Sequence, residues 1–136
     1  MDSLISTELI EKALDARKKA YAPYSEFQVG AALLCDDGTI FTGCNIENSA
    51  FGPSNCAERT AIFKAVSEGY GDFAAICIAG GPASETRPSE FCPPCGVCRQ
   101  VMAEFCRPDF KIILAKDAID FEIYTLEEML PFAFSL

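Results

Sequence analysis

The sequence contains no histidine and no tryptophan among its 136 residues. Without an imidazole, the chain cannot form a Ser-His or Cys-His catalytic pair, or any zinc site that needs a histidine ligand. No apolar run approaches the roughly 20 residues that a membrane-spanning helix requires. The segment 1–14 lacks the basic stretch of a signal peptide. We therefore expect a soluble, cytoplasmic protein with no membrane partner, folded as a single domain over residues 1–136.

Basic residues are also scarce, since 11 Lys and Arg face 20 Asp and Glu for a net charge of −9. Such a surface repels phosphate backbones, so we expect no nucleic-acid partner. Half of the residues are hydrophobic, which is enough for a sizeable core.

Hydrophobic periodicity and turn residues predict nine elements in the order αββαβαββα. Helices are expected at 7–21, with Thr7 as N-cap, and at 56–68, 95–106 and 125–131. Strands are expected at 27–35, 39–46, 73–80, 110–115 and 120–125. This order is typical of an α/β fold with one mixed sheet and helices on both faces.

Three of the eight cysteines stand at helix starts. Cys56 begins the second predicted helix, and the C-x-x-C pair Cys95 and Cys98 begins the third. If the strands before these helices run parallel in one sheet, both helix starts lie at the same edge and the thiols converge. Helix N-termini favour thiolate, and three thiolates with one open position are typical of a catalytic zinc site. Cys35, Cys44, Cys77 and Cys106 are expected as small core side chains or bystanders.

Two charged residues follow Cys56 directly. A helix-start carboxylate such as Glu58 is usually solvated, but next to a zinc motif it favours a proton shuttle between water and substrate. The charges of three thiolates and one Zn²⁺ sum to −1. At this net charge the zinc ion is a weak Lewis acid, unless positive groups nearby compensate the negative charge. Arg59 is expected to supply this compensation by donating hydrogen bonds to the thiolates.

Three other interpretations of the cysteines stay open. The thiols could be buried and inert. Cys92 in "CPPCGVC" could complete a closed four-thiolate structural zinc site, although the two prolines hold it in an extended segment. The C-x-x-C could also be a redox pair, which would leave Cys56 and Glu58 without a role.

Four motifs resemble those of the small zinc-dependent cytidine deaminases of pyrimidine salvage, and the likeness runs from about 21 to 134. They are "FQVGAAL" at 27–33, "GCNIEN" at 43–48, "CAE" at 56–58 and "PCGVC" at 94–98. The resemblance implies a three-layer α/β/α sandwich around a mixed five-stranded sheet, with one zinc per chain. It implies hydrolytic deamination of free cytidine and deoxycytidine to uridine and deoxyuridine, with release of ammonia. It also implies a homotetramer with shared active sites.

The resemblance also implies roles at the metal end of the site. Cys56, Cys95 and Cys98 would be zinc ligands, and Glu58 would be the proton shuttle. The backbone N–H of Ala57 would hold the carbonyl oxygen of the base.

At the sugar end, the resemblance implies that Asn45 and Glu47 bind the ribose hydroxyls, since a carboxylate accepts strongly from a hydroxyl. Phe27 is similar to the ring that packs on the pyrimidine. Phe134 is similar to an aromatic residue that enters a neighbouring subunit's site. Phe132, two positions earlier, is the alternative candidate for that residue.

These roles predict the substrate. Free cytosine would leave Glu47 buried and unpaired, so it should be poor. Phosphorylated cytidines and polynucleotides should be poorer, because Glu47 repels phosphate. Phe51 stands where relatives often have tyrosine, so a hydroxyl contact is expected to be missing there. A deaminase of a nucleoside antibiotic and a non-catalytic zinc scaffold stay open; "NIEN" disfavours the first and Glu58 the second.

Overall fold

A five-stranded mixed sheet forms the middle layer of the computed structural model, which describes residues 2–136. The strands are β1 (Phe27–Cys35), β2 (Ile40–Cys44), β3 (Phe73–Pro82), β4 (Lys111–Ala115) and β5 (Phe121–Thr125), in the spatial order β2-β1-β3-β4-β5. The pair β3 and β4 is parallel, and the other neighbours are antiparallel. Because β2 and β3 are both antiparallel to β1, they point in the same direction.

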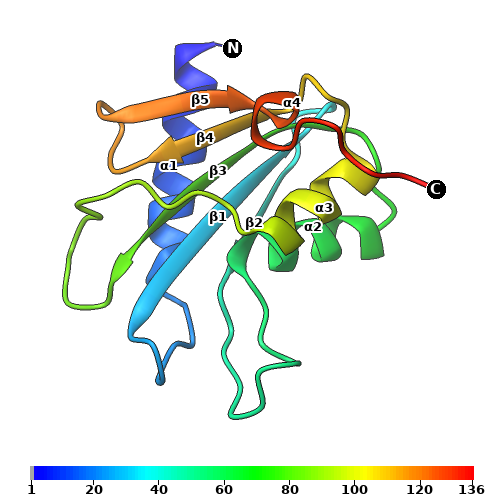
Figure 1. Cartoon of the computed structure of the whole chain (residues 1–136). Coiled ribbons are helices and arrows are strands. Elements are labelled where there is room, and N and C mark those ends of the chain that lie inside the picture. The colour runs from blue at the N-terminus through cyan, green and yellow to red at the C-terminus, as the bar shows by residue number, and fades with distance from the viewer. Residues whose placement is uncertain (1) are drawn as a thin grey trace.

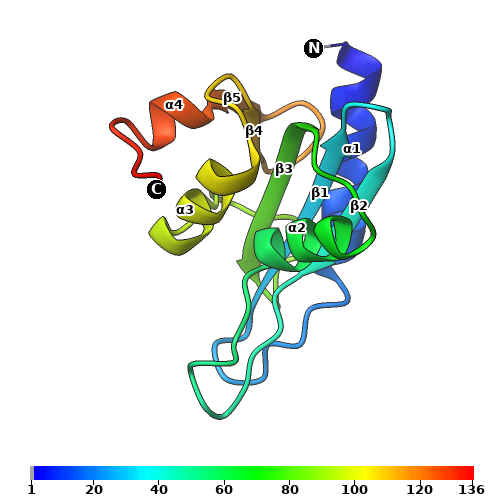
Figure 2. The same cartoon turned by 90° about the vertical axis from the view of Figure 1, so that its right-hand side faces the viewer.

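Helices cover both faces of this sheet (Figures 1 and 2). The helix α1 (Ser3–Arg17) packs on one face, where its apolar side chains meet small residues of β1 and β3. The helices α2 (Ala57–Ser67) and α3 (Gly96–Phe105) lie on the other face, and α4 (Leu126–Met129) follows β5. The three-layer α/β/α fold, the mixed sheet and the predicted order of elements are confirmed.

The start of α1 differs from the prediction. Asp2, not Thr7, is the N-cap, and its carboxylate accepts from the N–H of Leu4 at 2.8 Å. Thr7 lies one turn inside, where its hydroxyl donates to the carbonyl of Ser3. A carboxylate is at least as good a cap as a threonine hydroxyl, so the helix extends to the earlier signal.

Two glycines let helices approach the sheet closely. A Cβ on Gly30 of β1 would lie 2.0 Å from the carbonyl oxygen of Ala13 in α1. A Cβ on Gly43 of β2 would lie 2.6 Å from the carbonyl oxygen of Ala57 and 2.6 Å from the nitrogen of Ala61. Gly43 therefore determines how closely the first turn of α2 approaches β2.

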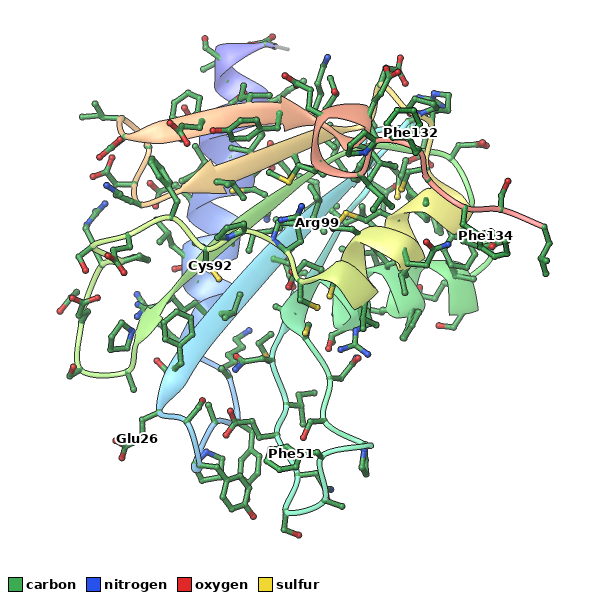
Figure 3. The ribbon with its side chains drawn as sticks, in the orientation of Figure 1. Glu26, Phe51, Cys92, Arg99, Phe132 and Phe134 are labelled. Atoms are coloured by element: carbon green, nitrogen blue, oxygen red, sulfur yellow. The ribbon has the colours of Figure 1, made fainter. Side chains whose placement is uncertain are left out.

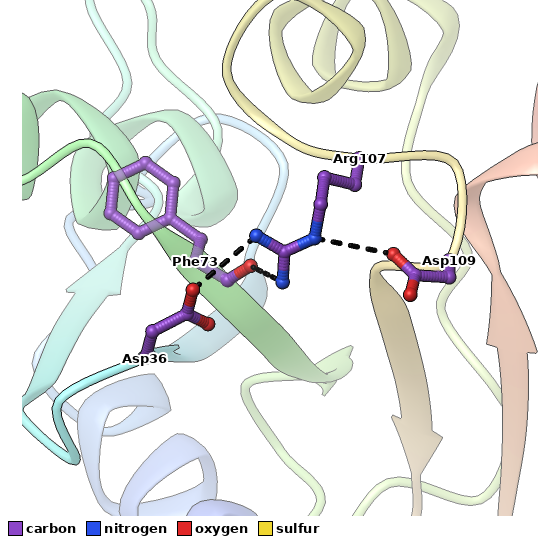
Figure 4. Close-up of polar contacts among 4 residues, drawn as sticks. All are labelled: Asp36, Phe73, Arg107 and Asp109. Atoms are coloured by element: carbon purple, nitrogen blue, oxygen red, sulfur yellow. Dashed lines mark hydrogen bonds and ion pairs between the residues drawn. The ribbon is translucent and has the colours of Figure 1, made fainter.

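A small polar cluster joins three segments at the edge where β3 begins (Figure 4). Arg107, just after α3, pairs with Asp36 at 3.3 Å and Asp109 at 3.4 Å, and donates to the carbonyl of Phe73. These side chains are largely solvent-exposed, so the pairs contribute little stability.

Within residues 2–136, no helix has the length and apolar character needed to cross a bilayer.

Candidate metal centre and substrate cavity

Three thiols meet at the sheet edge where β2 and β3 end. Cys56 is the N-cap of α2, Cys95 is the N-cap of α3, and Cys98 lies in the first turn of α3. The Sγ atoms of Cys56 and Cys95 are 3.9 Å apart, and those of Cys95 and Cys98 are 3.5 Å apart. Because β2 and β3 run in the same direction, the chain leaves both at one edge, which is why residues so distant in sequence converge.

The donor set fits zinc. All three sulfur atoms lie within 4.8 Å of one another, so the cysteines are positioned to bind a metal ion. Neither Cys56 nor Cys95 makes a side-chain cap hydrogen bond to its helix. Hydrogen bonds from Cys98 and then Arg59 lower the pKa of Cys56 to about 5, despite its partial burial. Three soft sulfur ligands near a helix N-terminus are chemistry that suits Zn²⁺.

Arg59 lies against this cluster. Its Nη2 donates to the Sγ of Cys56 at 3.2 Å. Its Nε is buried and has no hydrogen-bond partner within residues 2–136. The guanidinium thus brings a positive charge to an otherwise anionic centre.

Glu58 is buried beside the thiols, with 4% of its surface exposed. Burial raises the pKa of its carboxyl to about 7, and the neighbouring Cys56 acts in the same direction. A solvated position on the helix start is therefore excluded for this residue. A buried carboxyl group with a pKa near neutrality is suited to both accepting and donating a proton.

A cavity of about 410 Å³ opens in front of the cluster. This is large enough for a nucleoside-sized ligand. It brings together predicted residues from the metal end and the sugar end, along with several that sequence reasoning did not assign. Its lining comprises Val29, Asn45, Glu47, Phe51, Ser54, Asn55, Cys56, Ala57, Glu58, Arg59, Cys92, Pro93 and Cys95.

Cys92 lines this cavity but does not belong to the group of three thiols. Its sulfur packs towards β3, where a Cβ on Gly80 would lie 2.9 Å from it. Burial raises the pKa of the Cys92 thiol to about 11. The geometry thus does not favour a closed four-thiolate site.

Glu47 and Asn45 are tied to the beginning of β1. The Glu47 carboxylate accepts from the N–H groups of Tyr24 and Ser25 and from the Ser25 hydroxyl. Asn45 accepts from the N–H of Val29 and donates to the carbonyl of Phe27, both at 2.8 Å. The expectation that Glu47 is buried and unpaired without a sugar is wrong, because it is half-buried and holds a loop.

Two predicted aromatic residues do not line the cavity of their own chain. Phe27 is 38% exposed at the start of β1, and Val29, on the same face of the strand, lines the cavity instead. Phe134 lies on the C-terminal tail (Figure 3) and is 67% exposed. Its carbonyl accepts from the Nε2 of Gln100. Together with Phe132 it lines a separate hollow beside α3.

Sequence reasoning also missed residues that hold the site together. Arg99 donates from Nε to the carbonyl of Pro94 and from Nη1 to that of Met129, so it fastens the cysteine loop to α4. Ser25 contacts Glu47. The alternation of β1 could have identified Val29. The loop residues Ser54 and Asn55 belong to no periodic pattern.

Comparisons with known proteins agree with this site. The family model described as "Cytidine and deoxycytidylate deaminase zinc-binding region" matches residues 5–114. The chain is 53% identical over 127 residues to a cytidine deaminase of Halalkalibacterium halodurans, covering 93% of this chain and 92% of the relative. It is 50% identical over 131 residues to one of Sporosarcina psychrophila, covering 94% and 90%.

A solved structure of similar fold is the cytidine deaminase from Burkholderia pseudomallei. Its TM-score is 0.84 at 47% identity, and the match covers 93% of this chain and 97% of that one. The zinc-binding region, the convergent thiols and the shared fold lead to one assignment: this chain is a member of the zinc-binding cytidine and deoxycytidylate deaminase family.

Proposed function

We propose that the chain deaminates free cytidine and deoxycytidine hydrolytically to uridine and deoxyuridine, with release of ammonia. The observation that carries this proposal is the burial of Glu58 beside three convergent thiols in the wall of a cavity. Relatives that share half of the sequence bear the name cytidine deaminase, which supports the same reaction.

At the end of the cavity that holds the three thiols and Glu58, the protein would act mainly through proton transfer. Bound zinc supplies a water molecule of lowered pKa at the thiol cluster. Glu58 accepts a proton from the attacking water and gives it to N3 of the base while the water oxygen bonds to C4. It then takes the remaining proton from that oxygen and passes it to the amino group, so that the C4–N bond breaks, a carbonyl forms at C4 and ammonia leaves. The N–H of Ala57, in the first turn of α2, donates to the carbonyl oxygen of the base. Arg59 keeps the charge of the thiolates partly compensated.

The other end of the cavity would recognise the sugar. Asn45 and Glu47 offer acceptors for ribose hydroxyls. Phe27 is exposed outside the cavity lining and would have to turn towards the pyrimidine of the bound nucleoside to pack on it. The Glu47 carboxylate repels phosphate, so free nucleosides are the preferred substrates. Because the expected contacts are on the 3′ side of the sugar, deoxycytidine is used as well as cytidine.

We further propose that the chain works as one domain in a homotetramer, with Phe134 reaching a neighbour's cavity. Its exposure on the tail supports this arrangement. A cytoplasmic location would suit a site that needs reduced thiols, and the eight free cysteines support it.

The test is an absorbance assay of the purified protein with cytidine, combined with measurement of released ammonia. We expect stoichiometric uridine and ammonia, loss of turnover with a zinc chelator, and recovery on adding zinc. Parallel arms contain cytosine, cytidine monophosphate, a cytidine-containing oligonucleotide and a nucleoside antibiotic. Absence of cytidine turnover, or higher kcat/KM in any parallel arm, would contradict the proposal.

A further inference from the structure

The Ser25 hydroxyl lies between two residues of the sugar end. It donates to Oε2 of Glu47 at 2.5 Å and accepts from the N–H of Phe27 at 3.1 Å. The N–H groups of Ser25 and Tyr24 both donate to the other oxygen, Oε1, at 3.1 and 3.0 Å. One serine therefore contacts the carboxylate and also fixes the first residue of β1.

These contacts determine which carboxylate oxygen is available. A carboxylate offers about four acceptor positions, two on each oxygen. The loop occupies both positions on Oε1 and one on Oε2 of Glu47. One acceptor position remains, on Oε2, and the Ser25 hydroxyl bound to the same oxygen sets its direction.

The loop that carries Ser25 needs such support. Glu26, the next residue (Figure 3), has a φ of 55°, which is sterically unfavourable for a residue with a side chain. Its backbone is held by Ala22 on one side and Ala83 on the other. Ser25 adds the connection that joins this strained segment to the cavity lining.

We propose that Ser25 is a positioning residue that sets the preference for a sugar 3′-hydroxyl. Its hydroxyl would orient Oε2 of Glu47 towards the sugar and hold the backbone of Phe27 at the start of β1. This inference rests on the proposed role of Glu47 in binding the sugar. Separately, the hydrogen bond from Ser25 is the main cause that lowers the pKa of Glu47, which keeps the carboxylate an acceptor.

The experiment compares deoxycytidine with 2′,3′-dideoxycytidine, which differ only in the 3′-hydroxyl. The preference is the ratio of their kcat/KM values, measured for wild type, Ser25→Ala, Ser25→Thr, Glu47→Ala and the Ser25→Ala/Glu47→Ala double variant. Ser84→Ala is the matched control, because Ser84 is an exposed hydroxyl in a neighbouring loop. Zinc content and melting temperature are measured for each protein.

We expect Ser25→Ala to lower the preference about tenfold, mainly through KM for deoxycytidine, as for a weakened hydrogen bond to a charged group. Ser25→Thr keeps a hydroxyl and should restore the preference, and Ser84→Ala should not change it. In the Glu47→Ala background, Ser25→Ala should have no further effect on the ratio, because the two residues act through one contact.

Two failures are distinguishable. If Glu47→Ala leaves the preference unchanged, the sugar-binding role of Glu47 is wrong and the inference fails with it. If Glu47→Ala abolishes the preference but Ser25→Ala slows both substrates equally, Ser25 is only structural and the inference alone is overturned. Should Ser25→Ala not fold, Ser25→Gly removes the same hydroxyl and is judged by the same ratio.

Discussion

Glu58 shows most clearly how one residue connects burial with chemistry. Burying an ionised carboxylate so that 96% of its surface is removed from solvent costs free energy, unless neighbouring groups compensate the charge. It follows Cys56 by two positions, so the helix that supplies a thiol also brings the carboxylate to the cavity wall. Hydrophobic side chains would be the default at such a depth.

Glu58→Gln tests proton transfer without removing a ligand. Glutamine has nearly the same size but cannot carry the proton, so kcat should fall by about 10² to 10⁴. Zinc content should equal that of wild type, as measured by metal analysis of the purified protein. Activity within about tenfold of wild type would show that Glu58 is not the general acid and base.

Cys92→Ala separates a catalytic from a structural metal site. Because the Cys92 sulfur packs towards Gly80 and is not part of the three-thiol group, we expect normal zinc content and turnover within a few-fold of wild type. Cys95→Ala is the matched comparison, and it should lose zinc and activity together. Loss of zinc from Cys92→Ala would support a closed four-thiolate site instead.

At the scale of elements, the contact between α2 and β2 decides where Cys56 lies. Gly43→Ala would place a Cβ 2.6 Å from the backbone of α2, and neither backbone can give way easily. We expect a loss of about 2 kcal/mol or more in the free energy of unfolding, together with weaker zinc binding. Denaturant titration and metal competition measure the two effects.

Gly71→Ala is the control for this change. A Cβ on Gly71 would meet nothing within 4 Å, so stability and zinc affinity should stay close to wild type. Equal losses in both variants would mean that the glycine-to-alanine exchange itself, and not the close approach of α2, is responsible.

The elements were predictable because their signals are local. Strand alternation and helix periodicity identify β1, α2 and α3, and the spacing of Cys56, Cys95 and Cys98 identifies the metal centre. The start of α1 was missed because Asp2 outcompetes Thr7 as a cap. The loops were less predictable, since the contacts of Glu47 with Tyr24 and Ser25 depend on tertiary packing between segments.

For the whole molecule, the C-terminal tail carries several exposed apolar side chains close together in the sequence. Phe132 and Leu136 are fully exposed, and Phe134 is largely exposed. Apolar groups gathered in this way commonly mark a contact with another protein surface. We therefore expect the tail to be covered by other copies of the chain.

Sedimentation should give a mass four times the 14.7 kDa of one chain. A sharper measurement uses co-expression of Glu58→Gln with Phe134→Ala. Mixed tetramers would contain intact Glu58 in some subunits and intact Phe134 in their neighbours, so specific activity should exceed that of either parent. A fully active monomer, or mixed assemblies no more active than their parents, would contradict shared sites.

We expect the thiols at the starts of α2 and α3 to make conformational stability depend on metal supply. A ligand that binds only the folded chain adds RT ln(1 + [L]/Kd) to its unfolding free energy, or about 1.4 kcal/mol for each tenfold rise above Kd. Because one ion would join segments that are 39 residues apart, its release should loosen both helices in a single transition. We expect the melting temperature to rise steadily with buffered free zinc, and a flat profile would show that the two helices are held together without it. The folded fraction of this chain would then report the zinc concentration around it.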